Sequence, residues 1–405
     1  MKQYSNRLNK LGTETAFKVS ESASEFIKSG KVIYPYHLGD LNIPTPENII
    51  EAAKKALHEG KTGYVSPSGI PRLRKIISEV VGFERQIIYE PKNVVIQPGG
   101  KPVIAKFIQA IMNPGDGVLY PNPGYPIYES QIEFNGGIPL PYEFIPTSDG
   151  FMLDREKLES MIDNRTRILI YNNFQNPTGC ESDIEEMEWL SEIANKYNLW
   201  VLSDEAYFNI RYSGKSKSIA SFPGMKERTV ILYTFSKTFS MTGWRLGAAI
   251  GPSSLMKIFE KLSVNDESCT NHFVQCAGIE ALEGPQKYQK FITDKLKNRR
   301  NLLSEMLNAI HGVKVIVPDT TFYLYPDITE LYHCVDARSY EDFRTIILQK
   351  TGVSFCTREH FGKPNKIETR KYIRLAYSGI SIKDISLSMN VLKDFFSKSL
   401  SSSMV

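Results

Sequence analysis

Residues 229–250 read TVILYTFSKTFSMTGWRLGAAI and are the most informative stretch for the fold. Two short apolar runs, Val230–Thr234 and Ala248–Ile250, flank a hydroxyl-rich turn that carries Lys237 and Arg245. Unbroken apolar runs of this length are typical of strands that are buried on both faces. The stretch therefore predicts two core strands joined by a polar turn.

Similar apolar runs occur upstream, and helical patterns lie between several of them. Alternation of strand and helix over about 200 residues favours an open, mostly parallel sheet with helices on both faces. We therefore predict an α/β fold. The upstream strand candidates are Val94–Ile96, Gly117–Tyr120, Ile168–Tyr171 and Trp200–Ser203, and Glu185–Lys196 is a helical stretch.

The pattern changes near both ends of the chain. Pro44-Thr45-Pro46 opens an amphipathic helix with Ile49, Ile50, Ala53 and Leu57 on one face. After Gly284, a long helix at 291–310 precedes short strands near Val313–Val317, Phe322–Tyr325 and Tyr372–Ala376, helices near Tyr340–Lys350 and Ile382–Phe396, and a Ser-rich tail, 397–403, expected to be frayed.

The chain's 405 residues exceed what one hydrophobic core usually supports, so we expect two domains. Residues 47–285 form the large, ligand-binding domain in this prediction. Residues 1–46 and 286–405 form a smaller α+β domain, with the N-terminal segment packed on it or on a neighbouring subunit.

Composition excludes several classes of protein. A net charge of +4 is too small to argue for nucleic acid, and no apolar run approaches the roughly 20 residues of a membrane helix. The N-terminus is polar, unlike a signal peptide. Five cysteines without a Cys-x-x-Cys pair suggest reduced thiols in the cytoplasm, and six histidines without ligand spacing predict no metal site.

The turn that carries Lys237 has the residues of a covalent cofactor site. A lysine that forms a Schiff base needs a dry, positioned site and a lowered pKa. Arg245 can grip a phosphate with two parallel hydrogen bonds, and the hydroxyls of Thr234, Ser236 and Ser240 can add contacts. Ser-Lys-Thr alone is weak evidence for such a site, but the full run from Thr234 to Gly247, with Gly243-x-Arg245-x-Gly247, is much stronger evidence.

Two polar segments follow other predicted strands. Asp204 ends an apolar strand, where ligands bind in open α/β sheets, and its carboxylate can keep a ring nitrogen protonated. Tyr207 follows three residues later and can donate to a phenolic oxygen. Asn176, in Asn-Pro-Thr-Gly, can bond the same oxygen and a substrate carboxylate. A simple helix cap at Asp204 and an ordinary turn at Asn176 are the alternatives.

Two further segments fit a ligand that carries a phosphate and a carboxylate. Gly99-Gly100-Lys101 lies between a strand and a helix start, where free backbone N–H groups bind phosphate well. Arg374 lies inside an apolar strand pattern and needs a partner, which a substrate carboxylate can supply. A plain connector and an internal acidic partner, respectively, are the alternatives.

Together these segments resemble the class I/II aminotransferases, which are aspartate-aminotransferase-like enzymes of fold type I that use pyridoxal 5′-phosphate (PLP). The resemblance covers nearly the whole chain, from Gly39-Asp-Leu-Asn-Ile-Pro-Thr-Pro46 to Arg374. No Gly-x-Gly-x-x-Gly, P-loop or Gly-x-Ser-x-Gly motif competes with it. The order and spacing of eight residues match the family pattern: Tyr64, Gly100, Asn176, Asp204, Tyr207, Lys237, Arg245 and Arg374.

The resemblance implies a role for each site residue. Lys237 holds PLP and moves the proton, Asp204 binds the ring nitrogen, and Tyr207 and Asn176 bind the phenolic oxygen. Tyr125 stacks on the ring. Arg374 and Asn176, with the backbone at Gly39, take the substrate carboxylate. The phosphate is held by Arg245, Ser236, Thr234, the amides of Gly100 and Lys101, and Tyr64 of the partner subunit, so a homodimer is implied.

Two segments depart from the family pattern near the expected substrate entrance. Cys356-Thr-Arg-Glu-His-Phe361-Gly362 replaces a common Pro-Gly-x-x-Phe-Gly, and Thr320-Thr321 replaces a Gly before Phe322-Tyr323. Lys101, helped by Thr13 or Thr15, is the candidate reader of a distal carboxylate, with Arg358 as a further candidate. Lys101 as a solvated helix-start residue is the alternative.

The resemblance therefore implies transamination from an aspartate-like or broader range of L-amino acids to a 2-oxo acid, with 2-oxoglutarate expected. Two other readings stay open. A carbon–sulfur β-lyase would use the same carbanion chemistry. A non-catalytic PLP-binding regulator would usually carry a DNA-binding domain, and about 45 residues before Pro46 are too few for one.

Overall fold

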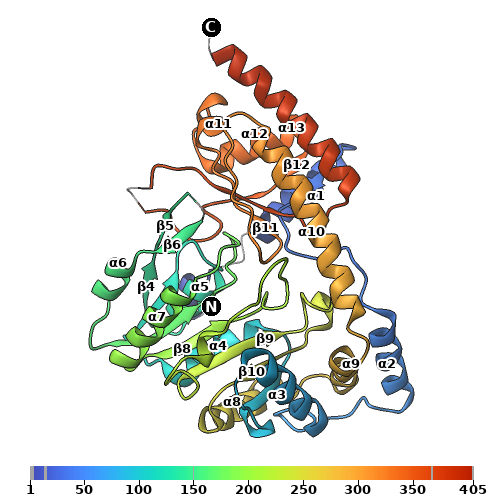
Figure 1. Cartoon of the computed structure of the whole chain (residues 1–405), viewed down its shortest axis with the longest axis vertical. Coiled ribbons are helices and arrows are strands. Elements are labelled where there is room, and N and C mark those ends of the chain that lie inside the picture. The colour runs from blue at the N-terminus through green and yellow to red at the C-terminus, as the bar shows by residue number, and fades with distance from the viewer. Residues whose placement is uncertain (1–3, 13–15, 149, 366–367, 404–405) are drawn as a thin grey trace.

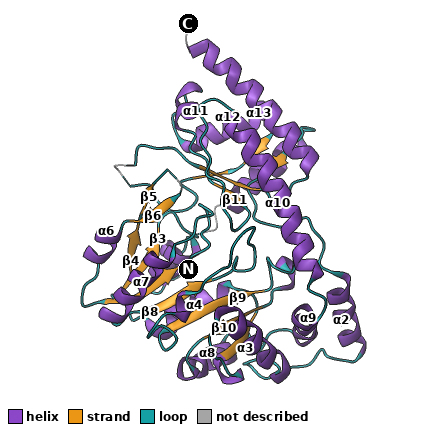
Figure 2. Ribbon diagram, viewed as in Figure 1, coloured by secondary structure: helices purple, strands orange, loops and turns teal. Residues whose placement is uncertain are grey.

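The computed structural model describes residues 4–12, 16–148, 150–365 and 368–403. Its centre is a seven-stranded sheet in the order β2-β10-β9-β8-β7-β3-β4 (Figure 2). Every neighbouring pair is parallel except those that involve β10, which runs antiparallel to β2 and β9. The strands are β2 Val94–Gln97, β3 Gly117–Pro121, β4 Ile138–Tyr142, β7 Thr166–Tyr171, β8 Trp200–Asp204, β9 Thr229–Thr234 and β10 Gly247–Ile250.

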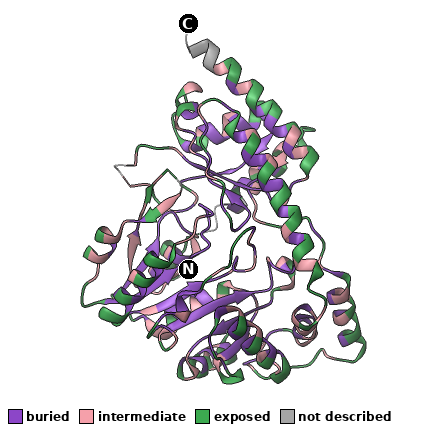
Figure 3. Cartoon of the chain, viewed as in Figure 1, coloured by how far each residue is buried: buried purple, intermediate pink, exposed green. Residues whose placement is uncertain are grey.

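Helices cover both faces of this sheet, which explains the unbroken apolar runs. Successive strand residues pack into different clusters, as Ile231 does on one face and Val230 and Leu232 do on the other. One face packs against α4 (Lys101–Ile111), α5 (Ile127–Phe134) and α8 (Ser253–Asn265). The opposite face packs against α2 (Glu47–His58), α3 (Pro71–Arg85), α6 (Arg155–Ser160), α7 (Ile184–Lys196) and α9 (His272–Glu283). The strands are accordingly buried and the outer helix faces exposed (Figure 3). The predicted α/β fold with a mostly parallel sheet is confirmed.

A smaller lobe lies above the sheet in Figure 1 and contains the C-terminal part of the chain. A three-stranded sheet, β11-β14-β13, lies at its base. The parallel pair of β1 (Tyr34–Pro35) and β12 (Val353–Ser354) joins the N-terminal segment to this lobe. The domain boundary at residues 46 and 286 remains a prediction. The other elements are α1 Ala16–Lys28, α10 Lys287–Asn308, β11 Tyr323–Leu324, α11 Thr329–Cys334, α12 Tyr340–Thr351, β13 Cys356–Thr357, β14 Ile373–Ala376 and α13 Ile382–Ser403.

One strand was missed, and three expectations about single elements were wrong. The edge strand β4 was missed because its sequence, IPLPY, contains two prolines, which sheets tolerate only at an edge. Residues 313–317 form only a bridge between Lys314 and Asp327. Leu57 is 46% exposed, since Ala56 takes the inner position of α2. The Ser-rich tail continues α13, and the Ser397 and Ser399 hydroxyls bond carbonyls one turn back.

Small elements complete the structure. The hairpin β5 (Phe144–Pro146) and β6 (Phe151–Leu153) projects from the large sheet's edge region. Short 3-10 turns lie at Asn6–Lys10, Pro91–Asn93, Ile219–Ser221 and Thr242–Trp244. Among the described residues, no helix combines the length and apolar character needed to cross a bilayer.

Candidate active site

A cavity of about 530 Å³ lies where the parallel strands end and the smaller lobe begins. Asp204 ends β8, Thr234 ends β9, and Asn172 directly follows β7, so three neighbouring strands deliver polar groups to one edge. This is where ligands bind in open α/β sheets. Twelve of the thirteen predicted site residues line the cavity: Gly39, Gly100, Lys101, Tyr125, Asn176, Asp204, Tyr207, Thr234, Ser236, Lys237, Arg245 and Arg374.

Lys237 lies in the turn after β9, with its amine inside the cavity. Its Nζ donates a hydrogen bond to the carbonyl oxygen of Gly39 at 2.7 Å. The same amine lies 5.4 Å from the centre of the Phe322 ring. The lysine is therefore held between the N-terminal segment and the smaller lobe, in a partly apolar setting that suits a nucleophilic amine.

Asp204 is buried and accepts hydrogen bonds from two neutral donors. The Tyr128 hydroxyl donates to Oδ2 at 2.6 Å, and the Ala206 N–H donates to Oδ1 at 3.2 Å. Burial raises the pKa of the Asp204 carboxyl, against the lowering effect of the Tyr128 hydrogen bond. A cationic ring nitrogen at this place would offset the cost of burying the charge.

Tyr128 was missed by the sequence prediction, although a signal exists. Tyr128, in the first turn of α5, follows Tyr125 by three residues, and the two rings meet edge to face at 5.7 Å. Asn172 was also given no role. Its side-chain amide donates to the Asp204 carbonyl at 2.9 Å, and its Oδ1 accepts from the Asn176 N–H at 3.0 Å.

The opposite end of the cavity is rich in donors suited to a phosphate. The first turn of α4 begins at Lys101, after Gly99 and Gly100, and the positive end of its helix dipole favours an anion at this place. Gly99 has φ of +99°, and a Cβ there would lie 2.1 Å from Nη2 of Arg245. Only glycine therefore lets the guanidinium lie against this loop.

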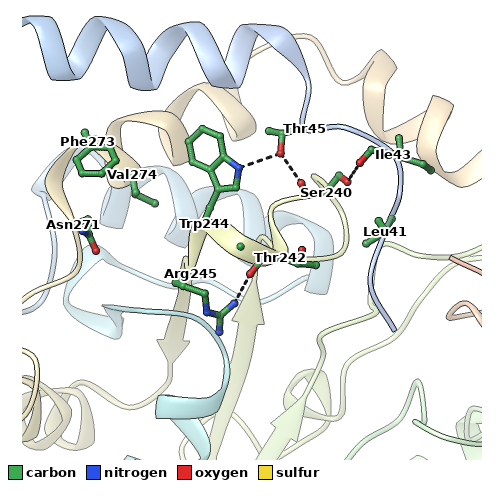
Figure 4. A pocket seen from close by; sticks show the side chains of 11 residues that line it. Leu41, Ile43, Thr45, Ser240, Thr242, Trp244, Arg245, Asn271, Phe273 and Val274 are labelled. Carbon is green, nitrogen blue, oxygen red and sulfur yellow. Dashed lines mark hydrogen bonds between the residues drawn. The ribbon is translucent and has the colours of Figure 1, made fainter. Parts of the chain in front are cut away.

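The Lys237–Arg245 turn is fastened to the N-terminal segment. The Trp244 indole donates to Thr45 Oγ1 at 3.1 Å, and this hydroxyl donates to the Ser240 carbonyl at 2.6 Å (Figure 4). The Ser240 hydroxyl in turn donates to the carbonyl of Ile43. Arg245 has φ of +54° and donates to the Thr242 carbonyl at 2.6 Å, so its exposed head faces both the cavity and the neighbouring groove.

Arg374 lies on β14 and brings its guanidinium to the cavity wall. It is buried, and its guanidinium donates to Asn176 Oδ1 at 2.9 Å and to the His37 carbonyl at 2.6 Å. Its Nε is buried with no hydrogen-bond partner. All these acceptors are neutral, so the internal acidic partner left open by the sequence is not found in the described part of the chain.

The segment Cys356–Gly362 reaches Arg374, and so does Tyr323, two residues after Thr321. The Phe361 ring lies 4.7 Å from its guanidinium carbon, and the Tyr323 ring lies on it at 4.6 Å. Cys356 Sγ is 3.8 Å from Nη2. Arg358, the further candidate for reading a distal carboxylate, lies elsewhere. Its buried guanidinium pairs with Glu368 at 3.0 Å and does not line this cavity.

Two other predicted contributors lie outside this cavity. Tyr64 is 89% exposed and does not line the cavity of its own chain. Thr13 and Thr15 lie outside the described residues. The cavity wall of a single subunit therefore lacks the tyrosine that the resemblance assigns to a partner.

The fold and the cavity together define an α/β enzyme with a polar ligand site at the carboxyl edge of its sheet. The sequence profile of aminotransferase class I and II matches residues 34–387, and the chain belongs to this family. Its activity is that of a transaminase. This confirms the family that the motifs indicated.

Several known proteins are similar over nearly their whole length. An aspartate aminotransferase of Geobacillus stearothermophilus is 30% identical over 92% of this chain and 93% of its own. An aspartate/prephenate aminotransferase of Cereibacter sphaeroides is 31% identical over 89% and 92%. The solved Thermus thermophilus aspartate aminotransferase with maleate superimposes with a TM-score of 0.90 at 28% identity, covering 97% of this chain and 100% of that chain.

Proposed function

We propose that this transaminase carries PLP, linked to Lys237, in the cavity described above. The observation that carries the proposal is the placement of Lys237, Asp204 and Arg374 on the walls of one cavity. The donor set suits this cofactor, since a buried carboxylate, an amine and an arginine beside a helix start match its ring nitrogen, aldehyde and phosphate. When bound, PLP supplies an electron sink for the carbanion left by loss of the substrate α-proton.

Each residue of the chain then has a defined task. Once the substrate amine has displaced it from the cofactor, Lys237 Nζ would take the proton from the substrate α-carbon and hold it for return. Asp204 keeps the ring nitrogen protonated, while Tyr207 and Asn176 hold the phenolic oxygen. Tyr125 stacks on the ring. The phosphate is bound by Thr234, Ser236, Arg245 and the amides of Gly100 and Lys101, all of which line the cavity.

The substrates we propose are an L-amino acid, aspartate or another acidic or medium-sized one, and a 2-oxo acid such as 2-oxoglutarate. Arg374 and Asn176, with the backbone at Gly39, bind the α-carboxylate. Lys101 is exposed at the start of α4 and lines the cavity, so it is placed to attract a second carboxylate. A lysine is a mobile point charge and accepts acidic substrates without excluding neutral ones.

A homodimer is part of this proposal. The side chain of Tyr64 is almost fully exposed, and Arg245 faces an open groove of about 650 Å³ that a partner subunit can cover (Figure 4). A partner's tyrosine would complete the phosphate site there. The five free cysteines fit a cytoplasmic location, which we also propose.

The test is chemical labelling of the lysine. The protein is loaded with PLP, reduced with borohydride and digested, and mass spectrometry is expected to find the cofactor on the Lys237 peptide. Lys101→Ala is the matched control, because it removes another cavity lysine and keeps the label. Label on another lysine, or no label, contradicts the proposal. Release of pyruvate from cysteine conjugates without any 2-oxo acid would indicate a β-lyase instead.

A further inference from the structure

Tyr323 lines the cavity, although the sequence analysis assigned it no role. Its hydroxyl lies 2.6 Å from that of Tyr207, and its ring packs on the Arg374 guanidinium at 4.6 Å. A Cβ built on Gly39 would lie 2.5 Å from the Tyr323 hydroxyl. One side chain thus contacts the proposed phenolic-oxygen donor, the carboxylate-binding arginine and the backbone that accepts from Lys237.

The backbone before Tyr323 is held in an unusual conformation. Thr321 has φ of +64°, in the left-handed region, where a β-branched residue is a steric outlier. Two buried tyrosine hydroxyls, from Tyr212 and Tyr377, donate to its carbonyl oxygen. The Thr320 hydroxyl bonds the carbonyl of Gly179 at 2.9 Å, in the loop that carries Asn176. Three side chains therefore hold the backbone from which Tyr323 projects.

We infer that Tyr323 is a positioning residue that joins the carboxylate site to the cofactor's phenolic oxygen, acting through Arg374 and Tyr207. The inference rests on the proposed function. The ring of Tyr323 holds the guanidinium plane of Arg374 toward the substrate. Its hydroxyl donates to the oxygen of Tyr207, whose own proton then points at the cofactor.

The hydroxyl and the ring of Tyr323 have separable effects: the hydroxyl acts on Tyr207 and the ring acts on Arg374. A hydroxyl that accepts one hydrogen bond becomes a stronger donor of the next, because bonds in a chain polarise one another. Tyr207 is fully buried, and burial raises its pKa well above the usual value, so it stays a neutral donor. It then stabilises negative charge on the phenolic oxygen, and this lowers the pH at which the cofactor's visible band titrates.

The experiment measures that band against pH in the PLP-loaded protein. Tyr323→Phe keeps the ring and loses the hydroxyl, so the midpoint is expected to rise by about 0.5–1 pH unit, as for loss of one buried hydrogen bond. We expect kcat to fall about 3- to 10-fold, while KM for the amino donor changes by less than about twofold. Tyr323→Leu loses the ring as well and is expected to raise KM about tenfold or more.

Tyr325→Phe is the matched control. Its hydroxyl is also buried, two residues further on, but it lines a different cavity, so the midpoint is expected to stay at the parent value. Gly39→Ala is a second test, because the added methyl group displaces the Tyr323 hydroxyl without changing that residue; the same rise in midpoint is expected.

The outcomes separate this inference from the proposed function. A parent protein that shows no visible band with PLP overturns the proposed function. A normal parent band with an unchanged midpoint in folded Tyr323→Phe overturns the positioning role alone. An equal midpoint shift in Tyr325→Phe also overturns it, because the effect would then come from general loosening of the smaller lobe.

Discussion

Replacing Asp204 by asparagine tests the electrostatic centre of the proposed site. Asparagine keeps the size of the side chain and an oxygen that can accept from the Ala206 N–H, so the turn after β8 is preserved. It removes the negative charge that holds the ring nitrogen protonated. The change therefore isolates charge from shape.

The expected loss is large because Asp204 is only 6% exposed. Breaking a buried ion pair by removing one partner costs roughly 3–5 kcal/mol. At about 1.36 kcal/mol for each factor of ten, turnover is expected to fall by about 10²- to 10⁴-fold. PLP itself should remain bound, since Lys237 and the phosphate contacts are unchanged.

The assay measures kcat for transamination with saturating PLP. The control is a substitution of an aspartate that only caps a helix, measured in the same way. Asp183 is the N-cap of α7, and its side chain accepts from the Glu186 N–H at 2.8 Å. Asp183→Ala is expected to cost about 1 kcal/mol of folding stability without changing kcat. A loss below tenfold in Asp204→Asn would show that Asp204 is a structural cap like Asp183, and the reasoning would be wrong.

In the cofactor-free protein, the same substitution is expected to increase folding stability. Burial raises the pKa of Asp204, so the folded state holds this proton more tightly than the unfolded state does. The contribution to stability therefore falls as pH rises from the unfolded pKa through the folded one. At pH 7, without PLP, Asp204→Asn should have a higher Tm than the parent, and PLP should stabilise the parent more than the variant.

Three further predictions concern substrate, assembly and pH. Lys101→Ala should raise KM for aspartate much more than for alanine; equal changes would refute its role with acidic donors. Mixing Lys237→Ala with Tyr64→Ala subunits should restore up to about a quarter of the parent's sites, in hybrid dimers only. No recovery despite proven subunit exchange would place Tyr64 in its own subunit's site. Burial and the Arg374 charge lower the pKa of His37 to about 4. The contribution of neutral His37 to folding stability is therefore fully present above about pH 6.5 and is lost as the pH falls toward 4. His37→Gln should flatten that fall in acid denaturation, whereas His311→Gln, at an exposed position, should not.

Local sequence was sufficient for the strands and for the residues that end them. The apolar runs of the parallel sheet are continuous because helices bury both faces, so β8 and β9 were visible without any partner. Asp204 and Lys237 could be placed because they follow such runs directly. The edge strand β4 could not, since it is half-buried and contains prolines, and its pairing with β3 alone makes it a strand.

Contacts between distant segments were decided only by the tertiary structure. Tyr128 meets Asp204 across 76 residues, and Tyr323 meets Tyr207 across 116, and neither pairing has a periodic signal in the sequence. The partner of Arg358 was likewise not readable, because an arginine in a loop pairs with whichever carboxylate the fold brings near, here Glu368. The sequence by itself therefore determined the sheet, the lysine and the charged groups at the strand ends. The fold decided which hydroxyls and rings orient them, because hydrogen-bond partners depend on distances in space that residue types and spacing do not encode.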